Sequence, residues 1–316
     1  MREPFEDPAP SALYDTLARS GLIERLFEIA RDEDLGDTGD LTSRSWFESD
    51  DPFEAHVVAR EPGVLAGLAC VGTICDVFAR SLAGAVACEP LIDDGASIAP
   101  GARLCTLIGP RSAVVGVERT ILNTIGRLSG VATLTSKYVE SARAGNPRVR
   151  VLDTRKTTPG LRALEKYAVR CGGGSCHRMG LWDAALVKDN HVAGMSDGSL
   201  RERVGRASVR ARELGASFVE IEVDSLDQLR ALLGLDSGVV DIVLLDNMTN
   251  GALREAVGMR DASNRALRLE ASGGVKLDTI EGIAGTGVER ISVGALTHSA
   301  VSLDVGLDTP DPARGA

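Results

Sequence analysis

Residues with the chemistry of an anion-binding site are concentrated between Val151 and His191. The stretch reads VLDTRKTTPGLRALEKYAVRCGGGSCHRMGLWDAALVKDNH and holds seven Lys or Arg and four acidic residues, a formal charge of about +3 in a chain of net charge −10. Nucleic-acid binding usually makes a whole domain basic, whereas a small anionic substrate needs only a local cationic site. The pattern favours such a substrate and no nucleic acid, with a solvated basic helix face as the alternative for Arg162, Lys166 and Arg170.

Two short apolar runs frame this stretch. Residues 149–152 and 184–187 predict buried strands, each followed at once by polar residues. Between them, Pro159 and apolar residues at helical spacing predict a helix that ends at the glycines 172–174. A strand, a crossover helix and a second strand make a parallel unit, and the carboxyl ends of such strands are the usual place for catalytic groups.

The same alternation of apolar strand-like runs and helical patterns continues towards the carboxyl terminus. Four further apolar runs each close on polar or glycine residues: 218–223, 241–245, 267–271 and 290–293. Helical patterns separate or precede them at 200–214, 226–233, 251–259 and 277–284. Six strands of this kind predict an α/β fold, an incomplete parallel α/β barrel (TIM-like) with its site at the carboxyl ends of the strands.

The residues at these strand ends differ in chemistry. Glu222 and Asp246 close successive strands, and two carboxylates suit a Mg2+ ion held through water. A serine and two glycines before the predicted helix at 277–284 offer backbone N–H groups to a phosphate, and the last strand end, where barrels often bind phosphate, adds two residues. The five residues of this expected phosphate site are Ser272, Gly273, Gly274, Val293 and Gly294.

The amino-terminal part of the sequence does not show this alternation of strands and helices. Residues 11–32 predict a helical stripe interrupted near Gly21, and short β-rich runs between 54 and 109 predict a small sheet. Residues 114–144 predict a long helix, interrupted at Gly130, that bridges two domains. We therefore expect a smaller α+β sheet domain at residues 1–125, joined by the carboxyl-terminal tail 300–316, and a catalytic barrel domain at 126–299.

Composition narrows the class further. A chain of 316 residues with 44% hydrophobic content can bury a large core, and no apolar run approaches the roughly 20 residues of a membrane helix. The acidic, proline-broken amino terminus is unlike a signal peptide, so a cytoplasmic location is expected. The six cysteines lack common zinc-ligand spacing and predict neither a metal site nor a disulfide, and the spaced acids of residues 34–42 predict a structural turn and not a calcium loop.

Four motifs resemble one enzyme family. TRKTTPGLR, the GGG and HRMGL pair, KDNH, and the Glu118-Arg119-Thr120 with Leu122-Asn123 of an ERT-x-LN signature are similar to quinolinate phosphoribosyltransferase, from about residue 33 to residue 298. The resemblance implies transfer of phosphoribose from 5-phosphoribosyl 1-pyrophosphate to quinolinate. The products would be nicotinate mononucleotide, pyrophosphate and CO2, in de novo NAD biosynthesis with Mg2+.

The resemblance also implies roles for individual residues. It assigns leaving-group and ribose stabilisation to Lys156, Lys188, Glu222 and Asp246, and the last two to the metal. It assigns the two quinolinate carboxylates to Arg119, Arg155, Lys156, His177 and Arg178. It assigns phosphoribosyl pyrophosphate to Lys188, Asp189, Asn190 and His191 together with the phosphate site. It places Arg119 in the active site of a neighbouring subunit, so a homodimer or larger even-numbered oligomer is expected.

Other hypotheses remain beside this one. A Schiff-base aldolase would also place Lys156 or Lys188 at a strand end, but it needs an uncharged lysine away from clustered arginines. A phosphometabolite-binding protein would share the anion sites without needing the Glu222–Asp246 pair, and a paralogue would use another pyridine or pyrrole acid. Arg119 has the alternative of a surface pair with Glu118. Ser175 and Cys176 depart from the family's usual residues before His177, which we interpret as a packing substitution.

Overall fold

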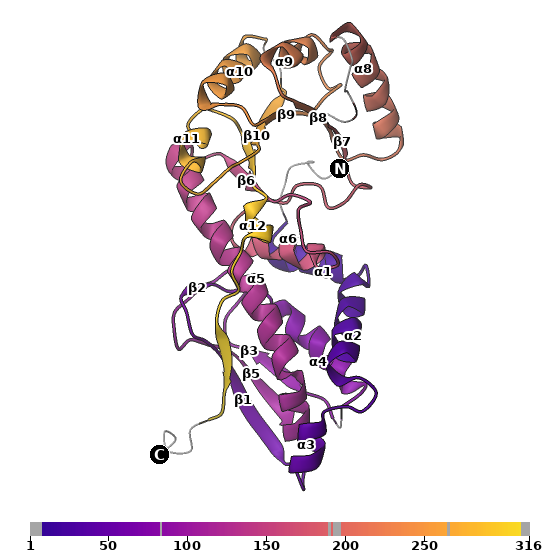
Figure 1. The fold of residues 1–316 in the computed structure, drawn as a ribbon, viewed down its shortest axis with the longest axis vertical. Coiled ribbons are helices and arrows are strands. Elements are labelled where there is room, and N and C mark those ends of the chain that lie inside the picture. Colours follow the sequence, from indigo (N-terminus) through magenta and orange to yellow (C-terminus); the bar gives the residue numbers. More distant parts are fainter. Residues whose placement is uncertain (1–7, 83, 189–190, 192–196, 264–265, 311–316) are drawn as a thin grey trace. The chain divides into compact units, whose positions relative to one another are not determined.

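The computed structural model describes residues 8–82, 84–188, 191, 197–263 and 266–310, and these form two compact units (Figure 1). We call residues 137–157 and 174–298 the barrel unit, and residues 8–136, 158–173 and 299–310 the small-sheet unit. Among the described helices, none has both the length and the hydropathy of a membrane span. The expected domain boundary at 125/126 stays a prediction.

The barrel unit contains a parallel six-stranded sheet. Its strands are β6 (Arg150–Leu152), β7 (Ala185–Val187), β8 (Val219–Val223), β9 (Ile242–Asp246), β10 (Arg268–Ser272) and β11 (Arg290–Ser292). Helices of the unit are α8 (Asp197–Glu213), α9 (Leu226–Leu233), α10 (Asn250–Ala262), α11 (Ile280–Ala284) and α12 (Ala295–His298). All six predicted strands are confirmed, whereas the predicted helix at 277–284 begins only at Ile280 because residues 277–279 form a turn.

The strand order is β6-β11-β10-β9-β8-β7, so β6 and β7 lie at opposite edges of the sheet. Residues 151–187 were predicted to form a parallel strand–helix–strand unit, and both strands do lie in this parallel sheet, but the helix does not belong to the barrel unit. The two strands are not neighbours, and the helix between them, α6 (Arg162–Cys171), belongs to the small-sheet unit. At the β6 edge, Ser175 forms a parallel bridge with Leu152, which brings the segment before His177 alongside the strand.

The two faces of the sheet have opposite character. On one face, register places Ile221, Val243 and Leu269 side by side, all buried, and α8 and α9 pack against β8. On the other face, the same register produces a row that runs from β8 to β6: Glu222, Leu244, Glu270, Arg290 and Arg150. Because successive residues of a strand alternate between faces, a sheet with one apolar face presents all of these charged groups on the other.

The small-sheet unit is built on an antiparallel sheet of four strands in the order β12-β1-β5-β3. They are β12 (Val305–Asp308), β1 (Pro52–Ala59), β5 (Arg103–Pro110) and β3 (Ala87–Pro90), beside a pair of β2 (Gly63–Val64) and β4 (Ser97–Ile98). Its shorter helices are α1 (Pro10–Ala18), α2 (Leu22–Leu35), α3 (Leu41–Trp46), α4 (Val71–Ala79) and α6. In the expected structural turn, Asp40 accepts the N–H groups of Thr42 and Ser43 and thereby caps α3.

One long helix departs from the expectation. Helix α5 (Arg111–Gly145) runs for 35 residues without the interruption predicted at Gly130. A β-carbon added at Gly130 would overlap the carbonyl group of Val301, so the glycine allows the returning chain to approach the helix closely. Gly130 is therefore required for close packing against the chain at Val301 and does not mark an interruption of the helix. A single glycine costs a helix only about 1 kcal/mol, which the surrounding turns can absorb.

Candidate active site

Lys188 and Glu222 meet at the ends of neighbouring strands. The Lys188 ammonium lies 2.5 Å from Oε2 of Glu222, with the lysine side chain 46% exposed and the glutamate 11%. Lys188 follows β7, and its backbone N–H donates to Nδ1 of His191 while the N–H of His191 donates to the Lys188 carbonyl. The expected phosphoribosyl pyrophosphate residues Asp189 and Asn190 lie outside the described residues.

The carboxyl ends of β9 and β10 are joined by a backbone hydrogen bond. Asp246 lies beside Ser272 in register, and the N–H of Asn247 donates to the Ser272 carbonyl. Asn247 has a positive φ of 52°, and its side chain donates to Oδ2 of Asp246. Gly273 has a φ of 90°, and a β-carbon there would overlap the side chain of Asn247. Glycine is required at this position, which keeps the backbone of the expected phosphate site close to Asp246.

Lys156 lies against the last strand end. The Thr297 hydroxyl donates to the Lys156 carbonyl at 2.8 Å, and a β-carbon at Gly294 would lie 3.1 Å from Cδ of Lys156. The N–H of Val293 donates to the Leu152 carbonyl, which joins β11 to β6 just before these residues. The structure therefore brings Lys156 beside Gly294 of the expected phosphate site, and the helix after Gly294 is only a four-residue turn, α12.

Arg155 and Arg178 form a cationic pair. Burial and the charge of Arg155 lower the pKa of Arg178, whose guanidinium donates to the Ala184 carbonyl at 3.1 Å. The Nε of Arg155 is buried, and the described residues offer it no hydrogen-bond acceptor. Two nearby guanidinium groups with an unsatisfied buried donor are unfavourable unless an anion lies between them. The pair thus has the electrostatics of a binding site for carboxylate or phosphate.

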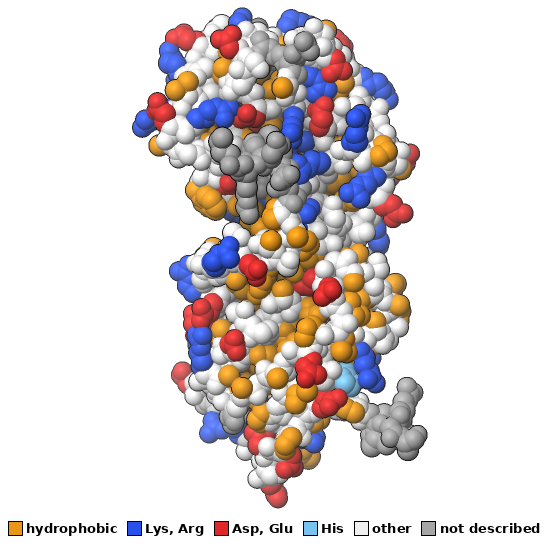
Figure 2. All heavy atoms as spheres, turned by 180° about the vertical axis from the view of Figure 1, so that it is seen from behind, with side chains coloured by type: hydrophobic (Ala, Val, Ile, Leu, Met, Phe, Trp, Pro, Cys, Tyr) orange, Lys and Arg blue, Asp and Glu red, His pale blue; other side chains and the backbone are white. Residues whose placement is uncertain are grey.

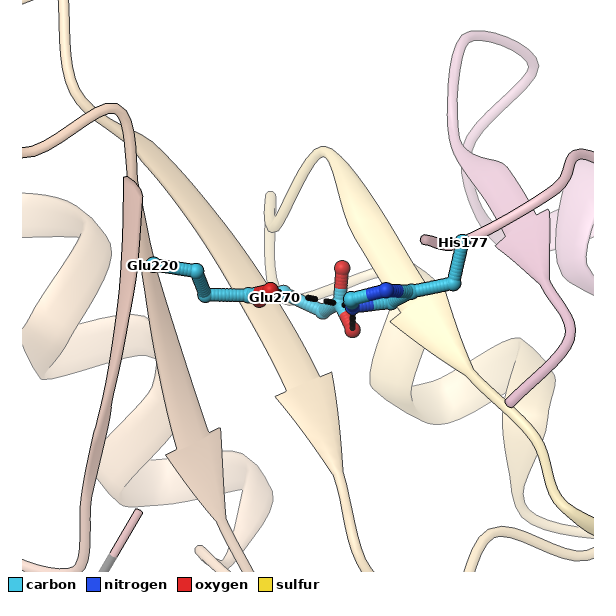
Figure 3. A group of neighbouring side chains, drawn as sticks. All are labelled: His177, Glu220 and Glu270. Atoms are coloured by element: carbon cyan, nitrogen blue, oxygen red, sulfur yellow. Dashed lines mark ion pairs between the residues drawn. The ribbon is translucent and has the colours of Figure 1, made fainter. Parts of the chain in front are cut away.

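Beneath this pair lies a buried group that the sequence analysis did not single out. Glu220 of β8 and Glu270 of β10 point towards the ring of His177, as Figure 3 shows. Nε2 of His177 lies 3.0 Å from Oε2 of Glu220 and 3.4 Å from Oε1 of Glu270. Arg290 Nε donates to the other oxygen of Glu270 at 2.7 Å. The sequence indicated the strand ends as candidate site residues because they are polar, whereas Glu220 and Glu270 were not indicated because they lie within apolar runs.

The backbone holds His177 from the opposite side. Its N–H donates to Oδ1 of the buried Asp153, which follows β6, and its Nδ1 accepts the N–H of Arg178 at 2.7 Å. The ring packs edge-on against Phe218 with centroids 5.8 Å apart. His177 was predicted to grip a substrate carboxylate, and that role stays a prediction; in the structure both ring nitrogens have partners in this buried group.

The buried group can hold one shared proton in two ways. Burial lowers the pKa of His177, but Glu270 and Glu220 outweigh it and hold that pKa above its usual value. The added proton would lie on Nδ1, where the Arg178 N–H already points. Burial and the neighbouring Glu270 also raise the pKa of Glu220, so the same proton can reside there instead. The hydrogen bond at Nδ1 favours a neutral imidazole with its hydrogen on Nε2.

A second buried carboxylate anchors the loop that follows Lys156. Glu165 on α6 is fully buried and accepts the N–H and hydroxyl of Thr158 at 2.9 Å and Arg127 Nη2 at 2.5 Å. The expected solvated face of this helix is wrong for Lys166, which is also fully buried. The TRKTTPGLR motif therefore contains residues whose task is to fix a turn, which a reading of charge alone did not reveal.

Arg119 belongs to the small-sheet unit, apart from the predicted residues that the barrel unit brings together. Its side chain is 65% exposed and lies 3.7 Å from Glu118, as the alternative reading expected. Arg119 and Asn123 of the ERT-x-LN signature also line a hollow of about 350 Å³ together with Leu26 and Phe27. The signature thus faces a concave surface.

The fold and the strand-end chemistry define a class. A parallel barrel whose carboxyl ends carry lysines, paired arginines, two carboxylates and a glycine turn is an α/β-barrel enzyme for anionic, phosphorylated substrates. Figure 2 shows many Lys and Arg side chains on the visible face of the barrel unit, and more hydrophobic ones on the small-sheet unit.

Comparison with known proteins identifies the family. The chain matches the quinolinate phosphoribosyl transferase N-terminal domain over residues 40–129 and the C-terminal domain over residues 131–308, and it belongs to that family. It is 41% identical to a nicotinate-nucleotide pyrophosphorylase [carboxylating] of Mycobacterium leprae over 89% of this chain and 98% of the relative. A Bacillus subtilis relative, named a probable enzyme of the same kind, is 38% identical over 87% and 89%.

Solved structures give the same result. The nicotinate-nucleotide pyrophosphorylase of Francisella tularensis superposes with a TM-score of 0.77 at 34% identity, covering 92% of this chain and 96% of that one. The corresponding structure from Ehrlichia chaffeensis has a TM-score of 0.78 at 34% identity, covering 90% and 98%. The predicted fold class, an incomplete parallel barrel beside a small α+β unit, is confirmed.

Proposed function

We propose that this protein transfers phosphoribose from 5-phosphoribosyl 1-pyrophosphate to quinolinate with loss of CO2, giving nicotinate mononucleotide and pyrophosphate for NAD biosynthesis. The observation that carries the proposal is the Arg155–Arg178 pair, in which the buried Nε of Arg155 lacks an acceptor among the described residues and the charge of Arg155 lowers the pKa of Arg178. Quinolinate has two adjacent carboxylates, and planar guanidinium groups bind carboxylates by two parallel hydrogen bonds. Lys156 adds a third cation, and His177 contributes through its contact with Arg178.

The phosphoribosyl donor would bind along the remaining strand ends. Its 5-phosphate fits the turn of Ser272, Gly273 and Gly274, where φ values of 90° and 60° at the glycines turn the backbone sharply. Val293 and Gly294 lie at the adjacent strand end, a usual phosphate position in barrels. Lys188 and the KDNH turn, which includes His191, would hold the pyrophosphate. The proposed roles of Asp189 and Asn190 in that turn follow from the family motif.

Glu222 and Asp246 fit a magnesium ion. Register places them on the same face of adjacent strands, Glu222 beside Leu244 and Asp246 two residues further along the same strand. Two oxygen donors at this spacing suit Mg2+, which keeps several waters. Bound there, the metal would neutralise charge on the pyrophosphate. Lys188, which contacts Glu222, places its own charge beside the same group.

The chemistry needs no covalent enzyme intermediate. Cleavage of the anomeric C–O bond leaves positive charge on the ribose ring and negative charge on pyrophosphate, which Lys156 and Lys188 stabilise. The pyridine nitrogen forms the new bond to the anomeric carbon. The 2-carboxylate then leaves as CO2, its electron pair stays at C2 beside the cationic nitrogen, and a proton takes its place. Arg155 and Arg178 orient the ring for this sequence by holding its carboxylates.

We further propose that the protein works as a homodimer or larger even-numbered assembly, in which Arg119 serves the barrel of a second subunit. Support comes from the exposure of Arg119 on a concave surface of the small-sheet unit. A cytoplasmic location is supported by the six cysteines, which form no disulfide among the described residues.

Comparison of two acids tests the reaction. Quinolinate should be used far better than nicotinate, because a guanidinium left without its partner costs on the order of 2–5 kcal/mol. The assay follows CO2 release and mononucleotide formation with each acid. Equal kcat/KM for both would overturn the diacid site, and turnover only with a different pyridine or pyrrole acid would make the protein a paralogue of altered specificity.

A further inference from the structure

The buried group of His177, Glu220 and Glu270 is not explained by catalysis at the strand ends. All three side chains are fully or almost fully buried, and two carboxylates so placed are strongly unfavourable unless they are compensated. Among the described residues, both oxygens of Glu220 and Oε1 of Glu270 have no hydrogen-bond partner, and Nε2 of His177 lies within ion-pair distance of Oε2 of Glu220 and Oε1 of Glu270. The unfavourable free energy of burying these two carboxylates has a use if they hold a neighbouring side chain in one orientation.

The geometry that is fixed is the orientation of one imidazole. With its Nε2–H directed at the two carboxylates, His177 presents the Nδ1 lone pair to the N–H of Arg178 at 2.7 Å. The hydrogen bond at one ring nitrogen determines the role of the other. Asp153 fixes the same peptide by accepting the His177 N–H at 2.8 Å.

Arg178 is consequently fixed at both ends. Its backbone N–H is bound to His177, and its guanidinium donates to the Ala184 carbonyl at the start of β7. A guanidinium held in this way meets a carboxylate without losing further side-chain entropy, and small displacements of such groups have large effects on rate.

We propose that Glu220 and Glu270 are positioning residues for the acceptor site: they orient His177 from inside the barrel so that it holds Arg178 in place for a carboxylate of the substrate. This inference rests on the proposed function in one respect, that the anion bound at Arg178 belongs to the acceptor acid. His177 then acts without touching that acid. Spacing within 4.8 Å would also suit a metal ion, but Arg290 already supplies a cation to Glu270.

Glu220 is the better residue for the test. Replacement of Glu270 would also remove the carboxylate to which Arg290 Nε donates, whereas the ion pair of Glu220 is with His177. Glu220→Leu removes the carboxylate beside Nε2 of His177 and keeps the volume, and Glu220→Gln removes the charge but keeps an oxygen at that position. Asp241→Asn serves as a control, because Asp241 accepts the Val219 N–H at the amino end of the same sheet.

The kinetic readout separates positioning from general damage. Glu220→Leu should raise the KM for quinolinate about tenfold or more while the KM for phosphoribosyl pyrophosphate stays within about twofold. Glu220→Gln should recover most of the loss, and Asp241→Asn should behave as wild type. Equal effects of Glu220→Leu on both substrates, or none on either, would overturn the inference. If wild-type protein fails to use quinolinate at all, the proposed function fails instead.

A spectroscopic readout covers the case in which Glu220→Leu does not fold. The chain has four histidines, so 15N-labelled histidine can be assigned in wild type and in Glu220→Gln by single replacements. His177 should show a protonated Nε2 and an unprotonated Nδ1, and quinolinate should leave both signals in place. A proton on Nδ1, a direct shift of the ring nitrogens on binding, or a stoichiometric metal in dialysed protein would each refute the arrangement.

Discussion

The ammonium of Lys188 and the carboxylate of Glu222 are bonded to each other across the ends of β7 and β8, 2.5 Å apart. The residue proposed for the leaving group and a residue proposed for the metal therefore neutralise one another before substrate binds. A metal-bound pyrophosphate arriving at this site offers each of them a partner of opposite charge. On binding, the Lys188–Glu222 ion pair would be replaced by two others, Lys188 with the pyrophosphate and Glu222 with the metal, so that neither side chain is left without a partner of opposite charge.

This arrangement predicts the behaviour of the metal pair. Glu222→Gln and Asp246→Asn should each raise the apparent Mg2+ and phosphoribosyl pyrophosphate requirements roughly ten- to a hundredfold, the equivalent of a charged hydrogen bond of about 1.5–3 kcal/mol. Quinolinate binding without the other substrate should stay nearly unchanged in calorimetry. A collapse of quinolinate affinity would assign the two carboxylates to a different part of the site.

Mixing two inactive variants tests the role of Arg119. If Arg119 acts in the neighbouring subunit, a dimer of one Arg119→Ala and one Lys156→Ala subunit has one intact site and one doubly altered site. Random exchange makes about half the dimers mixed, so roughly a quarter of wild-type activity should return. Zero recovery, with exchange verified by mass spectrometry, would contradict the shared site and leave the barrel assignments intact.

Gly130→Ala should destabilise the protein although alanine favours helices. The added β-carbon would overlap the Val301 carbonyl, and overpacking of this kind costs about 1–3 kcal/mol. Urea unfolding measures the loss. Gly72→Ala on α4 is the matched control, since a β-carbon there meets nothing within 4 Å, and it should be neutral or slightly stabilising. Equal stability of the two variants would mean that the chain at Val301 does not press on α5.

The buried Glu270 predicts a pH dependence of stability. Burial alone would raise the pKa of Glu270, but the His177 ring and Arg290, whose Nε donates to Oε2 of Glu270, hold it below its usual value. Because the folded pKa lies below the unfolded one, the unfolded state takes up the proton first, and falling pH favours unfolding. The contribution is complete above about pH 4.3, the usual value of an unfolded glutamate, and is lost as the pH falls towards the lower folded pKa.

The comparison of wild type with Glu270→Gln isolates this contribution. Their difference in unfolding free energy should shrink as the pH falls from 5 towards 3, whereas Glu255→Gln on the exposed face of α10 should differ from wild type by a small, constant amount. A Glu270→Gln difference that does not change over this range would rule out the ion pair as its source.

The pattern of apolar residues predicted where the strands of the barrel unit lie in the sequence, but not which strands are neighbours in the sheet. All six predicted runs of the barrel unit are strands, because a buried strand leaves a local apolar pattern, continuous in β9 and alternating with glutamates in β8. The order that separates β6 from β7 and the assignment of α6 to the other unit depend on contacts between distant residues, which local spacing does not record. The same holds for Gly130, whose partner is 171 positions away at Val301.

The candidate site was predictable where its residues are polar and follow a strand. Lys156, Lys188, Glu222 and Asp246 were predicted in this way, and their catalytic roles stay predictions. Glu220 was not predicted, because it alternates with apolar residues inside β8 and looks like part of an ordinary strand. Glu165 was missed for a different reason: it is the single carboxylate of α6, a helix with three basic residues, and nothing in the sequence shows that it is buried.

The pairing of β12 with β1 has a consequence for synthesis of the chain. Arg60, just after β1, bonds to Asp308 of β12 across 248 residues, and the whole barrel unit is encoded between them. A ribosome that adds 5–20 residues per second exposes β1 roughly 12 to 50 s before its final partner emerges. During that time one edge of the nascent sheet offers unpaired backbone groups to other chains. Translation speed and chaperone supply should therefore govern the yield of folded protein more than its final stability does.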